Sequence, residues 1–472
     1  MTVTAHATVT QAEPFRAAGG ADPRFARSAR ALDSPVTPNA VFDEWFAAQR
    51  RTNRYDVRRI PFADLDGWRF DDVTGNLVHA SGKFFSVEGL EVRTAWDDQD
   101  AGWSQPIINQ PEVGILGIVV KEFDGVLHLL MQAKMEPGNL DTVQLSPTVQ
   151  ATRSNFTQVH RGAAVRHLEY FAPPRTRSRL LFDSLQSEQG AWFLRKRNRN
   201  MVVEAIGEVP PHEDFVWLTL GQLHRLLLQD HMVNMDARTV LSLFPSLTDP
   251  GARSLHGTHD ILSRLTEVKA RRELVQRTVP LSQVTRWHRT ADEIAHDTGR
   301  HFKVIAADIR AANREVTHWT QPLLAPVETG LAAFLVRRID GVPHLLAHAR
   351  TEAGVLDVAE LAPTVQCHPA RALSLPAAQR PRYLDLVLSA PEHRVLLDTV
   401  QSEEGGRFHH AGNRYVLVAV DDDFPVTVPD DYTWITEPQL TELLRHGNYV
   451  NIEARTLVSL LRAAWGVRGE LV

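Results

Sequence analysis

The stretch Leu140–Gln150, LDTVQLSPTVQ, occurs a second time in the chain as Leu356–Gln366, LDVAELAPTVQ. Seven of the eleven positions are identical between the two stretches. A second pair, VNMDARTVLSL at Val233–Leu243 and VNIEARTLVSL at Val450–Leu460, again shares seven of eleven residues. The matches keep their order and nearly keep their spacing, which composition alone does not produce. The sequence therefore predicts an internal duplication.

The duplication sets the expected domain boundaries. Trp103–Pro106 also matches Trp319–Pro322, and Gln186–Phe193 matches Gln401–Phe408. We expect a flexible N-terminal tail at 1–41, repeat one at 42–246, a linker at 247–260 and repeat two at 261–472. Each repeat is too long for a solenoid unit, so each is expected to own a hydrophobic core.

Each repeat mixes strand and helix signals. Apolar runs on both sides of Asp124-Gly125 and of Asp340-Gly341 predict two β-hairpins, because Asp-Gly favours a tight turn. Helical periodicity is present at 218–228 and 436–444, and further helices are expected at 42–55 and 260–276. The pattern predicts an α+β fold, built as a tandem duplication of a mixed-sheet domain with flanking helices.

Composition excludes several classes of protein. The 472 residues include 51 Lys and Arg against 57 Asp and Glu, so a net charge of −6 does not favour nucleic-acid binding through bulk electrostatics. Cys367 is the only cysteine, which excludes an intrachain disulfide and indicates the cytoplasm. No apolar run reaches the roughly 18 residues of a membrane span. No strand is followed by G-x-G-x-x-G, and neither G-x-x-x-x-G-K-[ST] nor G-x-S-x-G occurs, which argues against nicotinamide, ATP and serine-hydrolase chemistry.

Polar residues at matching positions of the two copies are the candidates for a binding site. The first group follows a proline, at Pro147–Thr152 in repeat one and Pro363–His368 in repeat two. Its hydroxyl and amide groups suit hydrogen bonding to a polar ligand; a structural turn with self-bonded side chains is the alternative. The candidate binding residues of this group are Thr148, Val149, Gln150, Ala151, Thr152, Thr364, Gln366, Cys367 and His368.

The second group places a carboxylate beside a hydroxyl in both copies. Ser187 and Glu188 match Ser402 and Glu403, and Gly405 follows. A carboxylate in a pocket can act as a general base when burial raises its pKa, and an adjacent glycine lets a ligand approach the backbone. A solvated glutamate in a turn at a strand edge is the alternative.

Three further matched pairs suit a nucleotide ligand. Cationic pairs fit contacts with a pyrophosphate, although exposed surface charges are an equal alternative. A tryptophan pair provides either core anchors or flat platforms for a base. The pairs are Lys134 with Arg350, Arg199 with Arg414, and Trp68 with Trp287. His160 has no clear counterpart in repeat two and is either a lone catalytic imidazole or a surface histidine.

Several of these motifs together resemble the NDP-hexose 2,3-dehydratase family. The resemblance covers about residues 42–465, with the motifs in order in both halves. In repeat one they are LSPTVQATRSN at 145–155, LQSEQGAWF at 185–193, KRNRNMVVE at 196–204, WLTLGQLHRLL at 217–227 and VNMDARTV at 233–240. In repeat two they are LAPTVQ at 361–366, QSEEGGRF at 401–408 and VNIEARTL at 450–457.

The resemblance implies a fold, a substrate and partners. It implies tandem Nudix-like domains, each with a sugar-nucleotide pocket, and a homodimer. It implies a dTDP-linked 4-keto-6-deoxyhexose as substrate, in deoxysugar biosynthesis for an antibiotic-type natural product, and a separate NADPH-dependent 3-ketoreductase acting on the product. The metal-binding box of Nudix hydrolases, G-x5-E-x7-R-E-x2-E-E-x-G, is absent from both copies, so diphosphate hydrolysis is not expected. No cofactor, metal, nucleic acid or membrane partner is expected.

The implied reaction gives the candidate residues roles. Water is eliminated across C2 and C3 to give a 3,4-diketo-2,6-dideoxy sugar, which requires a base, an acid and donors to the enolate oxygen. We predict Glu188 as the base and His160 as the acid or alternative base. Repeat one is favoured as the reacting half, with repeat two as a binding pocket; the reverse assignment of the two repeats is the alternative. The other candidates would orient the sugar, hold the diphosphate or pack on the base. A non-catalytic nucleotide-sugar sensor and a Nudix-type hydrolase are the competing interpretations.

Overall fold

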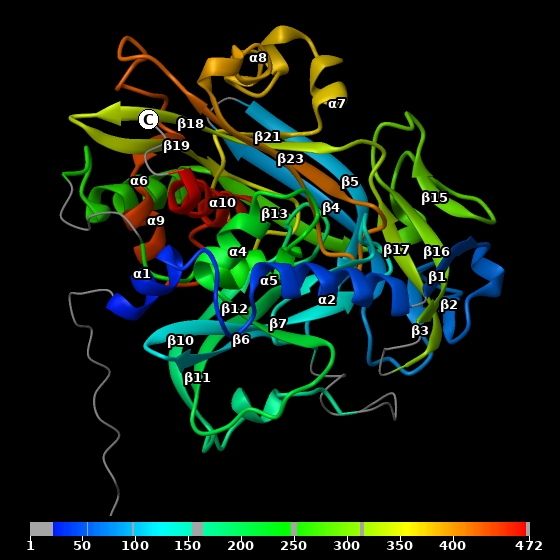
Figure 1. The fold of residues 1–472 in the computed structure, drawn as a ribbon. Helices are drawn as coiled ribbons and strands as arrows, with labels where there is room; N and C mark the ends of the chain where they lie inside the picture. The colour runs from blue at the N-terminus through cyan, green and yellow to red at the C-terminus, as the bar shows by residue number, and fades with distance from the viewer. Residues whose placement is uncertain are drawn as a thin grey trace, which may run out of the picture.

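A computed structural model describes residues 22–53, 55–96, 99–152, 164–246, 253–311 and 316–468. Each repeat contains a large mixed sheet, a smaller antiparallel sheet and helices (Figure 1). This is the mixed α and β architecture with a duplicated domain that the sequence predicts. Short 3₁₀ turns connect several elements: η1 (Phe62–Asp64), η2 (Leu168–Tyr170), η3 (Leu281–Gln283), η4 (Ala377–Gln379) and η5 (Glu392–Arg394).

The large sheet of repeat one runs in the order β10-β11-β6-β7-β12, with β8 beside β7 and β9 beside β6. Strands β6 and β11 are parallel, and the other pairs are antiparallel. Strand β6 is paired on both edges, and its first seven residues, 114–120, form a continuous buried apolar run, as expected for a strand that is covered on both faces. The strands are β6 (Gly114–Phe123), β7 (Val126–Met135), β8 (Val143–Ser146), β9 (Val149–Ala151), β10 (Ser178–Ser187), β11 (Arg197–Ala205) and β12 (Phe215–Thr219).

Repeat two builds the same sheet in the order β20-β19-β18-β23-β22, with β21 beside β18 and β24 beside β19. Its central pair, β18 and β23, is again parallel. The strands are β18 (Gly330–Ile339), β19 (Val342–Arg350), β20 (Glu360–Ala362), β21 (Val365–Cys367), β22 (Val395–Ser402), β23 (Gly412–Ala419) and β24 (Tyr432–Ile435). Short helices α7 (Pro369–Leu373) and α8 (Leu384–Leu388) lie between β21 and β22.

Both predicted hairpins are confirmed. Strands β6 and β7 pair with Phe123 opposite Val126, and β18 and β19 pair with Ile339 opposite Val342. The turn residues Asp124 and Gly125 have φ of 48° and 78°, and Asp340 and Gly341 have φ of 48° and 81°. Positive φ at both central residues is the geometry that favours Asp-Gly in a two-residue hairpin turn.

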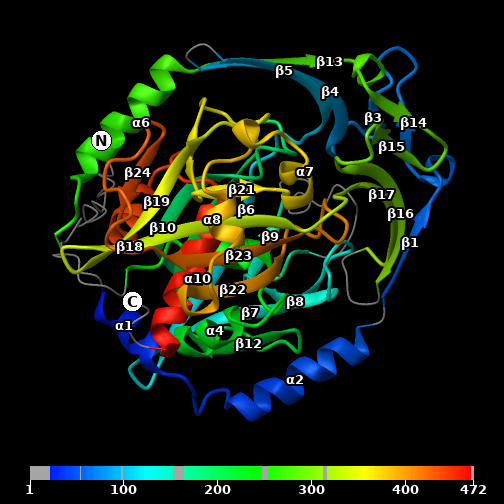
Figure 2. The ribbon, with the colours of Figure 1, turned by 90° about the horizontal axis from the view of Figure 1, so that it is seen from above.

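The two repeats exchange strands in their smaller sheets. Strand β1 (Tyr55–Ile60) of repeat one pairs with β16 (Lys303–Ala311), and β13 (Glu273–Val279) of repeat two pairs with β4 (Ser86–Trp96). Figure 2 shows α2 leading into β1 along β16, and α6 leading into β13 along β4. The remaining strands are β2 (Trp68–Phe70), β3 (Leu77–His79), β5 (Gln99–Asn109), β14 (Trp287–Arg289), β15 (Glu293–His296) and β17 (His318–Ala325). Neither small sheet is complete without the other repeat.

The helices pack into a core that both repeats share. One cluster of buried apolar side chains contains Leu116 and Val202 from repeat one together with Leu417 and Leu457 from repeat two. The expectation of a separate core for each repeat is wrong for this cluster, because α10 packs against both α4 and α5. The helices are α2 (Asn39–Thr52), α4 (Leu220–Leu227), α5 (Met235–Leu241), α6 (Thr258–Arg271), α9 (Glu437–Leu443) and α10 (Ile452–Arg468). In the described part of the chain, no helix is long and apolar enough to cross a membrane.

The expectation of a flexible tail up to residue 41 is wrong for residues 22–41. Helix α1 (Pro23–Arg30) begins at Asp22, whose side chain accepts a hydrogen bond from the Arg24 backbone N–H. Phe25 and Ala29 are buried in the shared core, and the Ser28 hydroxyl donates to the Leu127 carbonyl oxygen. Apolar burial and satisfied polar groups fix this segment on repeat one.

Candidate functional site

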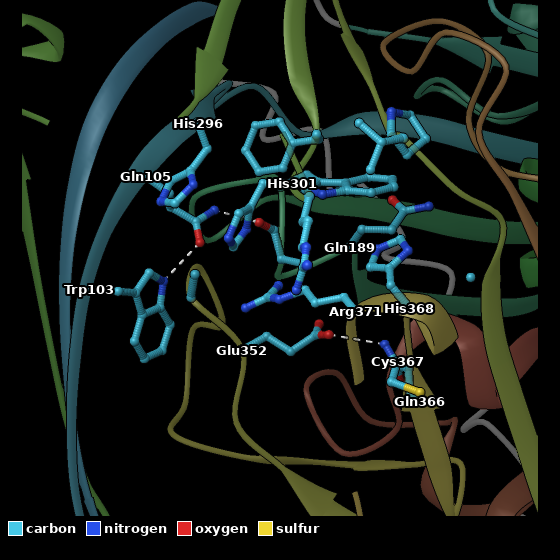
Figure 3. Close-up of a pocket in the computed structure, with 18 of the residues that line it drawn as sticks. Trp103, Gln105, Gln189, His296, His301, Glu352, Gln366, Cys367, His368 and Arg371 are labelled. Atoms are coloured by element: carbon cyan, nitrogen blue, oxygen red, sulfur yellow. Dashed lines mark hydrogen bonds between the residues drawn. The ribbon is translucent and has the colours of Figure 1, made fainter. Parts of the chain in front are cut away.

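The described residues enclose a pocket of about 650 Å³ in repeat two. Its walls come from β14, β15, β19 and β21, and from β5 and the 189–192 turn of repeat one. Figure 3 shows Trp103 and Gln105 on the β5 side, across from Gln366 and His368. The pocket therefore exists only because the two repeats pack together. Its volume lies in the range of small-molecule and cofactor sites.

One wall of this pocket is aromatic. The Trp287 indole N–H donates to the Ser104 carbonyl oxygen at 3.2 Å, which fixes the ring at the meeting point of the two repeats. Trp103 is 40% exposed, and its indole N–H donates to Gln105 Oε1 at 2.9 Å. His301 and Phe302 contact Trp287 ring to ring. Flat, partly exposed rings of this kind suit the stacking of a nucleobase.

The pocket also carries positive charge. Arg350, which contacts Glu352 at 3.3 Å, and Arg371 both line it. Burial, with a contribution from Arg371, lowers the pKa of His301 to about 4, and burial also lowers the pKa of His368. At neutral pH the imidazoles are therefore uncharged, and the two arginines supply the positive charge that an anionic ligand requires.

Glu403 lines this pocket, but both of its carboxylate oxygens already accept hydrogen bonds. Its Oε2 accepts from Gln189 Nε2 at 2.8 Å, and its Oε1 accepts from Asn413 Nδ2 at 3.0 Å and from the Tyr415 hydroxyl at 2.7 Å. Both oxygens are used, so this carboxylate is poorly placed to take a proton from a substrate.

Glu188, the counterpart of Glu403, has a different environment. Its Oε1 accepts from Asn198 Nδ2 at 2.7 Å, but its buried Oε2 has no hydrogen-bond partner among the described residues. Burial raises the pKa of Glu188, although Arg455 and Lys196 act in the opposite sense. A carboxylate with one free oxygen and a raised pKa has the properties of a general base.

Around Glu188 the structure gathers more ionisable groups than around Glu403. We call these residues the repeat-one cluster; their charges act on one another. Two of them come from repeat two. Burial lowers the pKa of Lys196 and raises that of Asp236 well above its usual range. The members of the cluster are Glu136, Glu188, Lys196 and Asp236 of repeat one, with Glu404 and Arg407 of repeat two.

Of the predicted residues that follow the two prolines, some are bonded within the sheet or buried in the core, and others line the pocket. Thr148 Oγ1 donates to the Leu130 carbonyl oxygen and accepts from the Val119 N–H, and Thr364 makes the same two contacts in repeat two. Both hydroxyl groups are bonded to the backbone of the sheet. This agrees with the alternative of a structural turn for these threonines rather than with ligand binding. Val149 and Ala151 are buried in the core. Gln366, Cys367 and His368 line the pocket. Burial raises the pKa of the Cys367 thiol to about 11, so it is neutral.

Strand geometry separates the predicted phosphate ligands from the site. Asn413 lines the pocket, and neighbouring side chains of a strand point to opposite faces. Arg414 is accordingly not among the pocket residues and pairs with Asp398 at 2.5 Å. Arg199 follows Asn198 in the same way and is paired with Asp183. We therefore do not retain the two arginines as diphosphate ligands.

Other predicted residues take positions near the site. Lys134 Nζ donates to the Gln150 carbonyl oxygen at 3.1 Å, while Gln150 Nε2 donates to Glu136 Oε1 at 2.5 Å. Trp68 donates to the Thr320 carbonyl oxygen at 3.0 Å, as Trp287 does to Ser104. Thr152 is half-buried after β9. His160 lies outside the described residues, so its role stays a prediction.

The predicted serines and Gly405 hold the repeats together. Ser187 Oγ donates to Glu360 Oε2 at 2.8 Å, and Ser402 Oγ accepts from Gln144 Nε2 at 2.7 Å. The N–H of Gly138 donates to the Gly405 carbonyl oxygen at 2.8 Å, and a Cβ on Gly405 would lie 2.2 Å from Asn139 Oδ1. The close approach that Gly405 permits is therefore to the other repeat, and the prediction that Ser187, Ser402 and Gly405 bind substrate is not retained.

Sequence reasoning missed the residues that one repeat contributes to the other. Gln189 and Trp192 line the repeat-two pocket, and Glu404 and Arg407 are their counterparts in the repeat-one cluster. They follow directly on the matched Gln-Ser-Glu motif, where the two copies first differ. That difference in side-chain chemistry was the available signal. His301 and Arg371 carry no comparable signal.

Glu360, which lies at the interface between the repeats, is expected to make the free energy of unfolding depend on pH. Its pKa is raised to about 7 by burial, whereas an unfolded glutamate titrates near 4.5. Between these values the unfolded chain binds fewer protons than the folded one, so stability falls as pH rises to about 7. We expect Glu360→Gln, which copies Gln144 of repeat one, to raise the free energy of unfolding by about 2 kcal/mol at pH 8 and little at pH 4.5.

Guanidinium titrations at the two pH values measure this difference. The reverse exchange, Gln144→Glu, is the matched control and should destabilise the protein more at pH 8 than at pH 4.5. An equal effect of Glu360→Gln at both pH values would contradict the expected titration.

The fold and pocket define a duplicated α+β protein with a composite pocket, which residues of both repeats line and which contains aromatic rings and arginines. The family model for NDP-hexose 2,3-dehydratase matches residues 39–244 and 258–461, once for each repeat. The chain belongs to the NDP-hexose 2,3-dehydratase family.

Curated relatives agree over nearly the whole chain. A protein of Amycolatopsis orientalis is 51% identical over 445 residues, which cover 93% of this chain and 94% of the relative. One of Streptomyces violaceoruber is 52% identical, covering 90% and 98%, and one of Saccharopolyspora spinosa is 51% identical, covering 94% and 95%. Each is named dTDP-4-dehydro-6-deoxy-alpha-D-glucopyranose 2,3-dehydratase.

Proposed function

We propose that this protein is a hydro-lyase that removes water across C2 and C3 of dTDP-4-keto-6-deoxy-D-glucose. Relatives with that activity in their names match it at about half of all positions over most of the chain. The observation that locates the chemistry is the contrast between two matched carboxylates. Glu188 Oε2 has no hydrogen-bond partner among the described residues, whereas both oxygens of Glu403 are held by donors. We assign the reaction to repeat one.

The proposed reaction begins at the carbon next to the ketone. The C4 carbonyl acidifies the C3–H bond, and Glu188 takes that proton while the electron pair moves into an enolate. The C2–O bond then breaks, and the hydroxyl group leaves as water with a proton from an acid. The resulting enol relaxes to the 3,4-diketone as C2 gains a proton. No oxidant or reductant is consumed.

Positively charged groups of the repeat-one cluster are suited to stabilise the enolate. The charge of Lys196 acts on Glu188, and that of Arg407 acts on Glu404. Burial desolvates both cations, which lowers their pKa values. A cation in a poorly solvated site stabilises developing negative charge more strongly than in water. We propose that these two residues stabilise the enolate oxygen during proton removal.

Repeat two is proposed to bind nucleotide without reacting. Trp287 offers a surface for the base, and Arg350 and Arg371 offer charge for the diphosphate. The counterpart of Lys196 in this repeat is Ala411, so the cation beside the carboxylate is missing. The pocket retains recognition elements but lacks the base and its cation.

Three finer features complete the proposal. The repeated unit is Nudix-like, which its mixed sheet with one parallel central pair supports. The chain forms a homodimer. A separate NADPH-dependent 3-ketoreductase consumes the product, because a vicinal diketone is reactive and the dehydration leaves it unreduced.

Incubation with dTDP-4-keto-6-deoxyglucose in deuterated water tests the proposal. A dehydratase yields a 3,4-diketo sugar nucleotide, which 1,2-diaminobenzene traps as a quinoxaline detectable by mass spectrometry. A hydrolase would release a nucleoside monophosphate, and a sensor would leave the sugar nucleotide unchanged. Either of the last two results contradicts the proposed activity.

A further inference from the structure

We propose that Glu404, a residue of repeat two, is the proton donor that releases the C2 hydroxyl group at the reaction site of repeat one. This inference rests on the proposed function and adds to it a residue from the other half of the chain. The reacting site is then composite: the base comes from one repeat and the acid from the other.

The duplication locates Glu404. Its counterpart Gln189 reaches across the repeat interface and donates to Glu403 Oε2 at 2.8 Å. The same relation between the repeats is expected to place Glu404 beside Glu188, and the charge of Glu188 does act on Glu404. Glu188 Oε2 is buried and has no hydrogen-bond partner among the described residues. Where repeat two has an amide against a carboxylate, repeat one has two carboxyl groups. A proton shared between the two is the way such a buried pair avoids repulsion.

Backbone contacts fix the turn that carries Glu404. The N–H of Phe408 donates to the Glu404 carbonyl oxygen at 3.0 Å, which closes the turn that carries Glu404. The N–H of Gly138 donates to the next carbonyl, that of Gly405, at 2.8 Å. A Cβ built on Gly406 would lie 3.3 Å from Glu404 Oε1 and 3.5 Å from Glu136 Oε1, so both carboxyl groups flank this turn.

Burial keeps Glu404 protonated at neutral pH. Burial raises its pKa to about 8, with Glu188 and Glu136 adding to the rise and with Arg407 and Lys196 opposing it. Asp236 faces the same group, and its pKa is raised for the same reasons. Glu404 is also partly exposed, unlike the buried Glu188, so a ligand can reach it. A protonated, accessible carboxyl group next to a base is the arrangement for acid-base catalysis.

Glu188 and Glu404 together account for both proton transfers of the elimination. Glu188 receives the proton from C3, and the electron pair of the C3–H bond forms the enolate. As the C2–O bond breaks, the hydroxyl takes the proton of Glu404 and leaves as water. Glu404 is then an anion beside a protonated Glu188, and transfer of that proton to Glu404 restores both groups for the next cycle.

Glu404→Gln tests this role, since it copies Gln189 and cannot donate a carboxyl proton. We expect water loss to slow at least 100-fold. Exchange of the C3 hydrogen with deuterated water should persist above the level of Glu188→Gln, because the enolate forms but returns to substrate. Glu404→Asp, which keeps an acid, should recover part of the rate. Glu208→Gln, an exposed carboxyl group paired with Lys121, is the control and should keep the wild-type rate.

The pH profile gives a second readout. For the wild type, kcat should fall as pH rises through about 8, because Glu404 loses its proton. Glu404→Asp should keep an alkaline decline, and Glu404→Gln should lose it. Wild-type kcat in Glu404→Gln, or loss of C3 exchange as complete as in Glu188→Gln, overturns the inference. If the wild type neither exchanges nor eliminates, the proposed function fails, and this inference fails with it.

Discussion

Replacing Glu188 with glutamine should lower kcat for water elimination at least 100-fold. The amide keeps the size of the side chain and can still contact Asn198, but it cannot take the C3 proton. General bases contribute about 10²–10⁴-fold to rates, and a 100-fold loss corresponds to about 2.7 kcal/mol of barrier. Quinoxaline trapping of the product gives kcat, and loss of the C3 hydrogen in deuterated water gives the proton-removal step directly.

Glu403→Gln is the matched variant in repeat two. It disturbs a carboxylate held by Gln189, Asn413 and Tyr415, so it should weaken nucleotide binding there while slowing turnover less than tenfold. Titration with thymidine diphosphate would measure that binding. If Glu403→Gln causes the larger loss of kcat, the reaction belongs to repeat two. If neither variant loses tenfold, about 1.4 kcal/mol, Glu188 is not the base.

Arg455→Ala should lower the free energy of unfolding by about 3–5 kcal/mol, because it removes one partner of a buried charge network. The Arg455 side chain is fully buried in α10. Its guanidinium group donates to the Val450 carbonyl oxygen at 2.7 Å, to Thr239 Oγ1 at 2.8 Å and to the Ser187 carbonyl oxygen. Ser187 belongs to repeat one and immediately precedes Glu188, so the loss would disturb both the interface and the base.

Arg238→Ala is the matched control for this effect. Arg238 donates to the carbonyl oxygens of Val233 and Ser402, both at 2.6 Å, but its Nε has no partner among the described residues. The smaller set of bonds predicts a loss about 1 kcal/mol below that of Arg455→Ala. Guanidinium titrations measure both. A loss under about 1 kcal/mol for Arg455→Ala would contradict a structural role at the interface.

Local patterns predicted local structure well. Asp124-Gly125 and Asp340-Gly341 predicted their hairpins because turn geometry depends on residues that adjoin in the chain. The helix expected at 260–276 ends at Arg271, and β13 follows from Glu273. The alternating burial of β13 arises from pairing with β4 of the other repeat, which no local pattern contains. Helix α1 was missed because its few apolar residues, Phe25 and Ala29, gain their burial only from repeat one.

The same division holds for the site. The motif comparison found Glu188 and Glu403 because both copies carry them, but the shared Gln-Ser-Glu motif itself gave no reason to prefer Glu188. Their ranking depends on Gln189 contacting Glu403 across 214 residues of sequence, and on Glu404 in the equivalent place. It could not place Arg199 and Arg414, which pair with Asp183 and Asp398, since the face to which a strand residue points is decided by the sheet around it.

By itself, the sequence determined that the chain is duplicated, that each copy is a mixed α and β unit, and that it resembles one family of sugar-nucleotide dehydratases. These properties are recorded in residue order and in short motifs. Only the tertiary structure decided that the repeats exchange strands, share a core and complete each other's sites. The contact from Arg455 to Ser187 joins residues 268 positions apart. Burial and charge act through space, so the properties of Glu188 and Glu404 depend on neighbours that the folded chain alone brings together.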